Sequence, residues 1–145
     1  MLRPHIGIVL ACFSPSITER LWLHCRQALQ EAGLQESDWT LLRVPGALEV
    51  PLALQHLARS NTFNGLIALG TVIRGETYHF EIVSDQSAAG IMRVQLDHHI
   101  PIANGILTTE NEWQAETRAY TKGRDCARTV LDLINSLNKG TSAHV

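Results

Sequence analysis

The sequence predicts one domain of α/β fold in which helices cover a four-stranded parallel sheet. Short apolar runs alternate with helical patterns along the chain, and each run is almost continuously apolar, as in strands buried on both faces. The 145 residues include 45% hydrophobic and 18% charged side chains, which is typical of a globular domain of this length. We expect the strands over residues 5–13, 39–44, 65–70 and 100–108.

Five helices are expected between and after these strands. The first has the capping-box spacing at Ser16 and Glu19 and ends at Gly33. The fourth has the same spacing at Thr109 and Glu112. The other helical patterns start near residues 48, 85 and 124, and the last of them ends near residue 137. Residues 139–145 are expected to form a flexible tail of the single domain over residues 1–145.

Charge and composition exclude several classes of function. The net charge is -2 with a pI near 6.4 and no basic run, so nucleic acid is not an expected partner. The apolar stretch 6–13 is too short for a membrane helix of about 20 residues, and we expect a cytoplasmic protein without membrane contact. Cys12, Cys25 and Cys126 are widely spaced and are expected to be free thiols. The histidines show no metalloenzyme spacing, so no metal site is expected.

Ligands of a parallel sheet bind beyond the carboxyl ends of its strands, so the loops that follow the strands are the candidate binding segments. After the third expected strand, Gly75 and Thr77 form either a phosphate-binding turn, in which backbone N–H groups hold the anion, or a plain turn. His79 lies in the same loop. It is either a general acid or base or a histidine that caps a helix or lies at the surface.

Four more side chains follow strands or share a helix face. Glu49 comes after a Pro-Gly turn, where it either complements a helix dipole or binds an amide or hydroxyl-rich ligand. Phe13 ends the first strand and either packs in the core or stacks on a flat heterocycle. Arg118 and Lys122 are four residues apart on one helix face, which is either solvated or meets an anion.

Three long motifs, in this order, make the chain resemble the lumazine synthase family. They read VPGALEVP from residue 44, LGTVIRGETYHFEIVS from residue 69 and PIANGILTTENEWQA from residue 101, and the resemblance extends from residue 6 to about 122. It implies a flavodoxin-like three-layer sandwich. It also implies a transferase without a cofactor, which condenses 5-amino-6-(D-ribitylamino)uracil with 3,4-dihydroxy-2-butanone 4-phosphate to 6,7-dimethyl-8-ribityllumazine in riboflavin biosynthesis.

The resemblance further implies a role for individual residues. His79 matches the catalytic histidine that transfers protons. The pyrimidine substrate is expected to contact Phe13, Ala47, Leu48, Glu49, Thr71, Val72, Ile73 and Asn104. The phosphate is expected to contact Gly75, Glu76, Thr77, Arg118 and Lys122.

The sequence departs from the family pattern at four places. Ser14 stands where Asn is usual, Asn104 replaces a frequent aromatic of the pyrimidine pocket, and Thr117 stands where Glu usually precedes the arginine. Residues 120–125 lack the longer glycine- and lysine-rich turn that often separates the last two helices. Without a gap in the alignment, Lys122 matches the second basic residue of the family; with a gap, that residue is absent.

The resemblance also implies an assembly. Arg118 and Asn104 would serve a pocket whose Phe13 and His79 belong to the next subunit, which requires a closed cyclic oligomer. We expect a homopentamer or a pair of pentamers, and the shortened turn disfavours an icosahedral shell. Riboflavin synthase is a candidate partner. Two other functions stay open at this point: a catalytically inactive flavin- or lumazine-binding protein, and a shell-forming protein with a mainly structural role.

Overall fold

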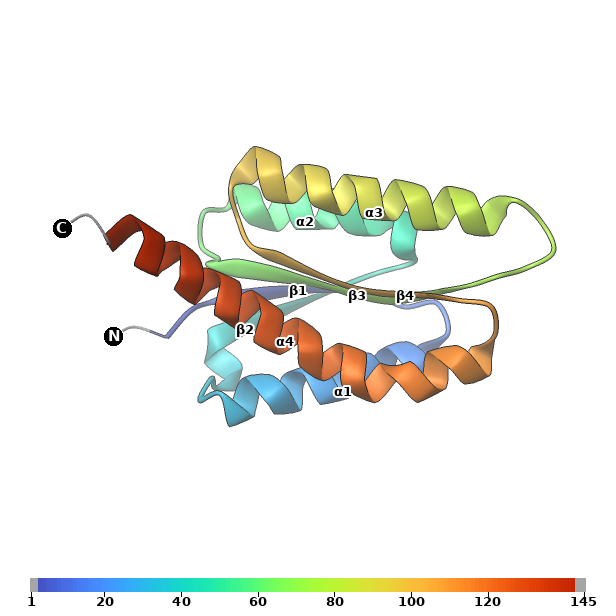
Figure 1. Cartoon of the computed structure of the whole chain (residues 1–145), viewed down its shortest axis with the longest axis horizontal. Coiled ribbons are helices and arrows are strands. Elements are labelled where there is room, and N and C mark those ends of the chain that lie inside the picture. Colours follow the sequence, from blue (N-terminus) through green and yellow to red (C-terminus); the bar gives the residue numbers. More distant parts are fainter. Residues whose placement is uncertain (1–2, 143–145) are drawn as a thin grey trace.

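The computed structural model describes residues 3–142 as four parallel strands and four α-helices (Figure 1). The strands are β1 (Ile6–Ala11), β2 (Trp39–Val44), β3 (Gly65–Ile73) and β4 (Ile102–Thr109). The α-helices are α1 (Pro15–Glu31), α2 (Val50–Arg59), α3 (His79–His98) and α4 (Glu112–Ser142). Two short 3-10 helices, Glu36–Asp38 and Ala47–Glu49, precede β2 and α2.

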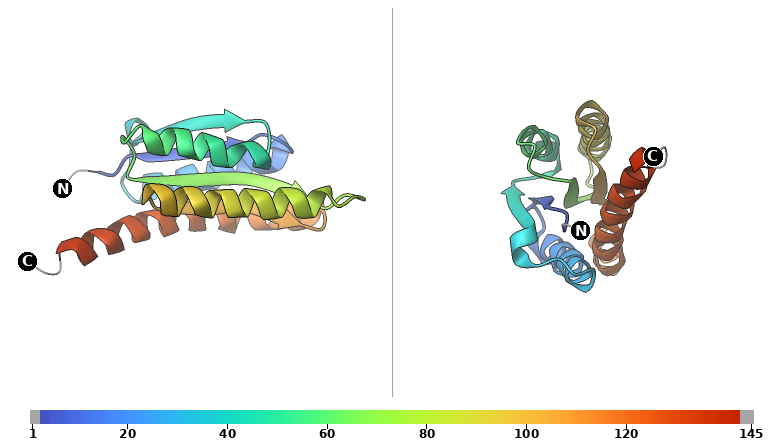
Figure 2. Two further views of the ribbon diagram at one scale, coloured as in Figure 1. Left: turned by 90° about the horizontal axis from the view of Figure 1, so that it is seen from above. Right: turned by 90° about the vertical axis from the view of Figure 1, so that its left-hand side faces the viewer.

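The sheet has the strand order β2-β1-β3-β4, and all neighbouring strands are parallel. Helices α2 and α3 cover one face, and α1 and α4 cover the other (Figures 1 and 2). The prediction of an α/β three-layer fold with a four-stranded parallel sheet is therefore confirmed.

The core consists of two apolar clusters, one on each face of the sheet, because successive side chains of a strand point to opposite faces. In β1, Ile8 and Leu10 belong to the cluster under α1 and α4, whereas Val9 and Ala11 belong to the cluster under α2 and α3. All four side chains are almost fully buried. This two-sided burial explains why the run is apolar without interruption.

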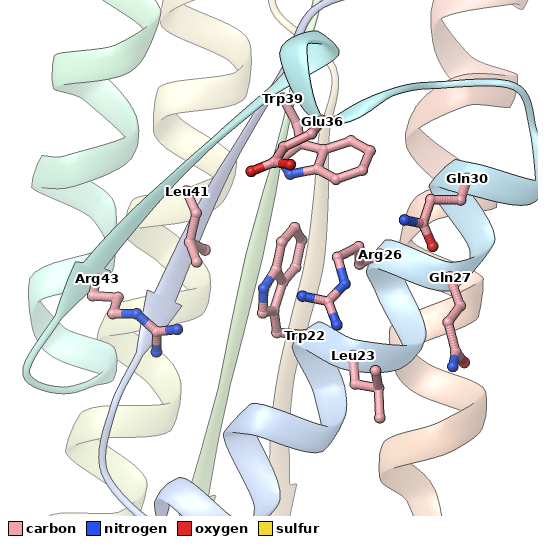
Figure 3. Close-up of a pocket in the computed structure, with 9 residues that line it drawn as sticks. All are labelled: Trp22, Leu23, Arg26, Gln27, Gln30, Glu36, Trp39, Leu41 and Arg43. Carbon is pink, nitrogen blue, oxygen red and sulfur yellow. The ribbon is translucent and has the colours of Figure 1, made fainter.

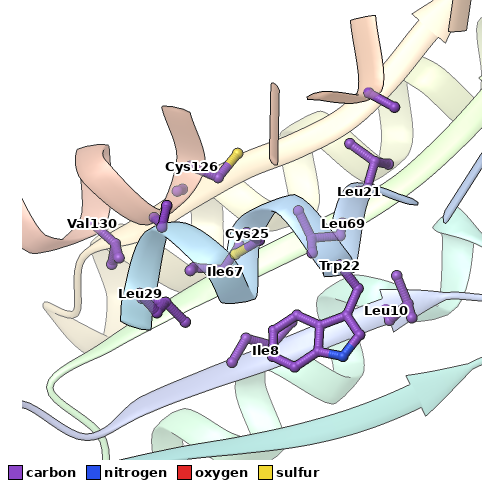
Figure 4. Packing of buried hydrophobic residues seen from close by; sticks show 14 of the residues in the cluster. Ile8, Leu10, Leu21, Trp22, Cys25, Leu29, Ile67, Leu69, Cys126 and Val130 are labelled. Atoms are coloured by element: carbon purple, nitrogen blue, oxygen red, sulfur yellow. The ribbon is translucent and has the colours of Figure 1, made fainter. Parts of the chain in front are cut away.

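The cysteines are unpaired, as expected for free thiols. Cys25 and Cys126 are buried in the cluster between the sheet, α1 and α4 (Figure 4). Burial raises the pKa of both thiols, to about 11 for Cys126. Cys12 is only half-buried at the end of β1.

Two strands differ from the expectation. β2 is only partly buried because it lies at the edge of the sheet. The expectation that every strand is buried on both faces is therefore wrong for β2. β3 is longer than expected and ends at Ile73, since its pairing with β4 continues until Ile73 lies opposite Thr109. Thr71, Val72 and Ile73 are thus residues of the strand and not of the following loop.

The start of α1 also differs from the expectation, whereas its end does not. The helix begins at Pro15 with Ser14 as the capping residue, so Ser16 lies in the first turn and the predicted capping box is wrong. Ser14 makes no side-chain capping hydrogen bond and has a left-handed backbone, with φ 57°. Gly33 follows the helix with φ 98°, which confirms the predicted stop.

The capping box predicted at Thr109 is also wrong, because β4 continues to that residue. Asn111 caps α4 instead: its Oδ1 accepts a hydrogen bond of 2.9 Å from the N–H of Gln114. The Gln114 Oε1 in turn accepts a hydrogen bond of 2.8 Å from the N–H of Glu110. The capping residue, Asn111, thus lies two residues after Thr109, the capping residue that the spacing predicted.

The fourth and fifth expected helices are one continuous helix, α4, of 31 residues. Gly123, next to the expected start of the fifth helix near residue 124, lies inside it, where a Cβ would stand 2.4 Å from the carbonyl oxygen of Leu21 in α1. This glycine permits a close approach of two helices and does not end one. α4 also continues over Lys139–Ser142, where we expected a tail to begin, while residues 143–145 lie outside the described residues.

Candidate functional site

A pocket of about 530 Å³ lies at the carboxyl ends of β1, β2 and β3. It is lined by Phe13, Ser14, Gly46, Ala47, Leu48, Glu49, Thr71, Val72, Ile73, His79 and Val83. The structure thereby brings together His79 and all the predicted pyrimidine contacts except Asn104. Ser14, Gly46 and Val83 were not singled out as contacts from the sequence. The pocket occupies the edge of the sheet at which parallel α/β folds bind ligands.

Phe13 is 66% exposed, so its alternative interpretation as a core residue is wrong. β1 ends two residues before it. The N–H of Cys12 is shared between the carbonyl oxygens of Val44, at 2.9 Å, and Pro45, at 3.1 Å, and the N–H of Phe13 donates to that of Pro45 at 3.1 Å. The ring lies against Gly46, where a Cβ would stand 2.7 Å from Phe13 Cε2. The missing side chain at Gly46 thus leaves room for the aromatic ring.

Glu49 is fixed in the wall of the pocket by the turn that follows β2. Its Oε1 accepts a hydrogen bond of 2.9 Å from the N–H of Gly46. The bond closes the short 3-10 turn Ala47–Glu49, from which α2 continues. A carboxylate has further acceptor positions, so Glu49 can still accept N–H or O–H groups of a ligand.

The end of β3 forms the floor of the pocket. The Val72 side chain packs in the cluster under α2 and α3, whereas Ile73 packs against the cluster on the opposite face. Alternation along the strand places the Thr71 side chain on the same face as Ile73. A ligand in this pocket would therefore meet the main chain of Thr71 and Ile73 and not their side chains. The buried Thr71 Oγ1 has no hydrogen-bond partner within residues 3–142.

His79 is exposed and is the first residue of α3. The expectation that it lies in the loop before this helix is therefore wrong. The apolar pattern had placed the start of this helix near Asp85, but the helix starts six residues earlier. The N–H of His79 donates to Thr77 Oγ1 at 3.3 Å. The imidazole is thus attached to a rigid helix end and lines the same pocket as Phe13.

Gly75, Glu76 and Thr77 form an exposed loop between β3 and α3. They do not line the Phe13 pocket but lie directly before the N-terminus of α3. A Cβ at Gly75 would meet nothing within 4 Å, so the loop is open to a ligand at this point. Backbone N–H groups before a helix N-terminus favour anions, which agrees with the predicted phosphate turn.

Asn104, Arg118 and Lys122 lie away from the Phe13 pocket of the same chain. Asn104 is exposed on β4, and its Oδ1 accepts a hydrogen bond of 3.0 Å from the N–H of Ile106. Arg118 and Lys122 line a separate hollow of about 360 Å³ beside Leu107, which confirms that they share one face of the helix. One chain thus carries two groups of predicted site residues at separate places.

A larger hollow of about 690 Å³ lies beside the edge strand β2, and sequence reasoning missed it (Figure 3). The Trp22 and Trp39 rings meet edge to face there, with 6.1 Å between their centroids. The Arg26 guanidinium lies 5.7 Å from the Trp22 ring centroid. The sequence signal was the alternation of Trp39, Leu41 and Arg43 on a strand at the edge of the sheet. No predicted site residue lines this hollow.

Within residues 3–142, no group of three His, Cys, Asp or Glu side chains is arranged to hold a metal ion. No helix in the same range is both long and apolar enough to cross a lipid bilayer.

Comparison with known proteins identifies the family. The model of the family described as 6,7-dimethyl-8-ribityllumazine synthase matches residues 3–138. The chain is 56% identical to the 6,7-dimethyl-8-ribityllumazine synthase of Paracidovorax citrulli, over 93% of this chain and 88% of that protein. The enzymes of the same name from Ralstonia pickettii and Chromobacterium violaceum are 56% and 53% identical, over 92% and 90% of this chain and 80% and 84% of theirs. On this evidence the chain belongs to the 6,7-dimethyl-8-ribityllumazine synthase family.

Proposed function

We propose that the Phe13 pocket is the active site in which this transferase condenses 5-amino-6-(D-ribitylamino)uracil with 3,4-dihydroxy-2-butanone 4-phosphate. The product is 6,7-dimethyl-8-ribityllumazine, the precursor of riboflavin. One observation carries the assignment of the site: an exposed aromatic ring, a fixed carboxylate and a histidine, each from the segment that follows a different strand, line one pocket at the carboxyl ends of the strands.

The reaction requires little from the protein beyond positioning of the two substrates and transfer of protons. The 5-amino group of the pyrimidine attacks the ketone of the butanone, and loss of water leaves an imine. Phosphate then leaves by elimination, and the ribitylamino nitrogen closes the ring with loss of a second water. The substrate supplies the amine, so no enzyme lysine is needed. His79 moves the protons of these steps.

The pyrimidine binds in the pocket itself. The exposed Phe13 ring stacks on the heterocycle, and the turn Ala47–Glu49 holds the ring and its ribityl chain. The main chain at Thr71–Ile73 supplies further hydrogen bonds, since the Thr71 and Ile73 side chains face away. Asn104 of a neighbouring subunit completes the pyrimidine site.

The phosphate binds beside His79. The N–H groups of Gly75, Glu76 and Thr77 lie before the N-terminus of α3 and hold the anion. Arg118 of a neighbouring subunit adds a charge-assisted hydrogen bond, and Lys122 lies on the same helix face.

The two separated groups of site residues support a cyclic homopentamer, or a pair of pentamers, with sites shared between adjacent subunits. Apolar side chains on the outer faces of α2 and α3 are left uncovered in one chain: Leu52, Ile82, Met92 and Leu96 are all exposed. Such a patch is typical of a protein interface. The continuous α4, without an inserted turn at residues 120–125, favours pentamers over an icosahedral shell.

Three further proposals concern the whole chain. The chain is a single domain, since the family model extends over residues 3–138. The unpaired thiols favour the reducing cytoplasm. Riboflavin synthase is the partner that would take up the product.

The decisive experiment is to mix the purified protein with both substrates and to follow the fluorescence of the lumazine. We expect turnover by the wild type. His79→Ala should lower kcat by about 10- to 1,000-fold with little change in pyrimidine affinity, since a positioned acid or base contributes on that scale. His5→Ala is the control and should keep wild-type kinetics, because His5 precedes β1 at the edge of the sheet opposite the pocket. Unchanged turnover in His79→Ala would contradict the catalytic role of this histidine.

A further inference from the structure

We propose that Arg74 is a positioning residue, which holds the phosphate loop Gly75–Thr77 and His79 in the geometry that the reaction uses. The proposal rests on the function proposed above for this loop and for His79. Arg74 is the first residue after β3, and no role was predicted for it from the sequence. Its side chain lines neither the Phe13 pocket nor the hollow beside Arg118.

The guanidinium of Arg74 contacts three side chains. Its Nε forms a hydrogen bond of 2.6 Å with Glu110 Oε2, in the turn between β4 and α4. A second nitrogen pairs with Glu81 in the first turn of α3. The guanidinium carbon lies 4.3 Å from the centroid of the Phe80 ring. The bond to Glu81 holds the pKa of that carboxyl below its usual value, so the pair is charged at neutral pH.

These contacts close the phosphate loop at its base. The chain leaves the sheet at Arg74, passes through residues 75–78 and returns at His79, next to Phe80 and Glu81. The two ends of the loop are therefore joined through the Arg74 side chain. Only an arginine offers a planar fork that binds two carboxylates at once and also stacks on a ring. The N–H of Arg74 is fixed as well, by a 2.9 Å bond to the carbonyl oxygen of Thr109.

Glu110 anchors this arrangement to α4. Its N–H donates to Gln114 Oε1 at 2.8 Å, within the cap of that helix. Arg74 thereby connects the loop before α3 with the turn before α4. If the loop moves by about 1 Å relative to the pocket, catalysis can fall by roughly 100-fold, because the reacting groups lose their alignment.

Arg74 has one competing role, direct binding of the substrate phosphate, and Glu110 separates the two. Glu110→Gln removes the charge that holds the guanidinium. If Arg74 binds phosphate directly, this variant frees the arginine and lowers the KM for the butanone phosphate or leaves it unchanged. If Arg74 positions the loop, the same variant loosens the loop and raises that KM.

The test compares Arg74→Met, Arg74→Lys and Glu110→Gln with the wild type in steady-state kinetics with both substrates. For Arg74→Met we expect a KM for the butanone phosphate raised about 10-fold and a kcat lowered about 10-fold, with the KM for the pyrimidine within about twofold. Arg74→Lys should recover part of the loss, since an ammonium keeps the charge but not the fork. Glu110→Gln should raise the KM for the phosphate substrate about threefold, and combining it with Arg74→Met should add little.

Arg124→Met is the matched control, because Arg124 also pairs with one carboxylate, Glu31, and lies 5.5 Å from an aromatic ring, that of Tyr120. It joins α1 and α4 and should leave the kinetics of both substrates unchanged. Wild-type kinetics in Arg74→Met, with an active wild type, would overturn the proposal. A lower or unchanged KM in Glu110→Gln would also overturn it, in favour of direct binding. An inactive wild type would instead refute the proposed function.

Discussion

Phe13 shows how a single residue can point to a function. Two-thirds of this large aromatic side chain is exposed to solvent at the mouth of the pocket, although full burial of a Phe would contribute about 1.5–3 kcal/mol to folding. Gly46, against which the ring lies, has no side chain that would displace it. Stacking of the ring on a ligand would explain why Phe13 is exposed in the free protein.

Phe13→Ala should therefore weaken the pyrimidine and not the butanone phosphate. Loss of the stacking area is expected to raise the Kd of the pyrimidine by roughly 10-fold, with a smaller change in the KM of the phosphate substrate. Fluorescence titration of the pyrimidine measures the effect. The exposed Trp113, on the first turn of α4, offers a control in Trp113→Ala. Equal pyrimidine affinity in wild type and Phe13→Ala would count against the stacking role.

Ser14 has an unfavourable backbone conformation. Its φ of 57° is left-handed, which costs a non-glycine residue on the order of 1 kcal/mol, whereas Asn adopts this region more readily. Ser14→Asn should thus raise the free energy of unfolding by up to about 1 kcal/mol, measured by chemical denaturation. Ser16→Asn, two residues later inside α1, should give no such gain. A less stable Ser14→Asn variant would contradict this explanation.

At the level of elements, the contact between α1 and α4 depends on Gly123. A Cβ there would stand 2.4 Å from the Leu21 carbonyl oxygen, so either the helices separate or the backbone shifts. Gly123→Ala should lower the free energy of unfolding by about 1–3 kcal/mol, despite the higher helix propensity of alanine. Gly140, in the same helix, has nothing within 4 Å of its Cβ position. Gly140→Ala should therefore be neutral or slightly stabilising, and an equally stable Gly123→Ala would refute the close approach.

For the whole molecule, the separation of Phe13 and His79 from Arg118 predicts complementation between subunits. Arg118→Ala and His79→Ala should each be at least about 10-fold less active than the wild type when assembled alone. Co-assembled in equal amounts, they should recover about a quarter of the wild-type activity, because a site that takes its two residues from adjacent subunits is intact in that fraction of random pairs.

Light scattering coupled to size exclusion gives the assembly of the same samples. No recovery in demonstrably mixed oligomers would contradict the shared site, and an active monomer would contradict it directly. A megadalton particle would contradict only the expectation of pentamers without a shell. Wild type mixed in equal amounts with the double variant His79→Ala/Arg118→Ala is the control for subunit exchange, because about half of the wild-type activity should remain without exchange and about a quarter with random exchange.

The sequence by itself determined the fold class, the family and most of one half of the candidate site. The continuous apolar runs predicted a sheet buried on both faces, because this burial requires apolar side chains on both sides of a strand. The residues that follow these runs, among them Phe13, Glu49 and His79, then had to meet at one edge of the sheet. The pattern of the strands therefore predicted where the pocket lies.

The tertiary structure alone decided the exact ends of the elements and the contacts between them. A new helix was expected to start near residue 124, but α4 continues through Gly123, at the point where α1 approaches it closely. Thr109 had the spacing of a capping residue, yet pairing with β3 kept it in the strand. Arg74 had no local signal, since one of its two carboxylate partners, Glu110, lies 36 residues away along the chain and the other, Glu81, lies beyond the loop 75–78. Local patterns report local preferences, whereas contacts between distant segments exist only once the chain has folded.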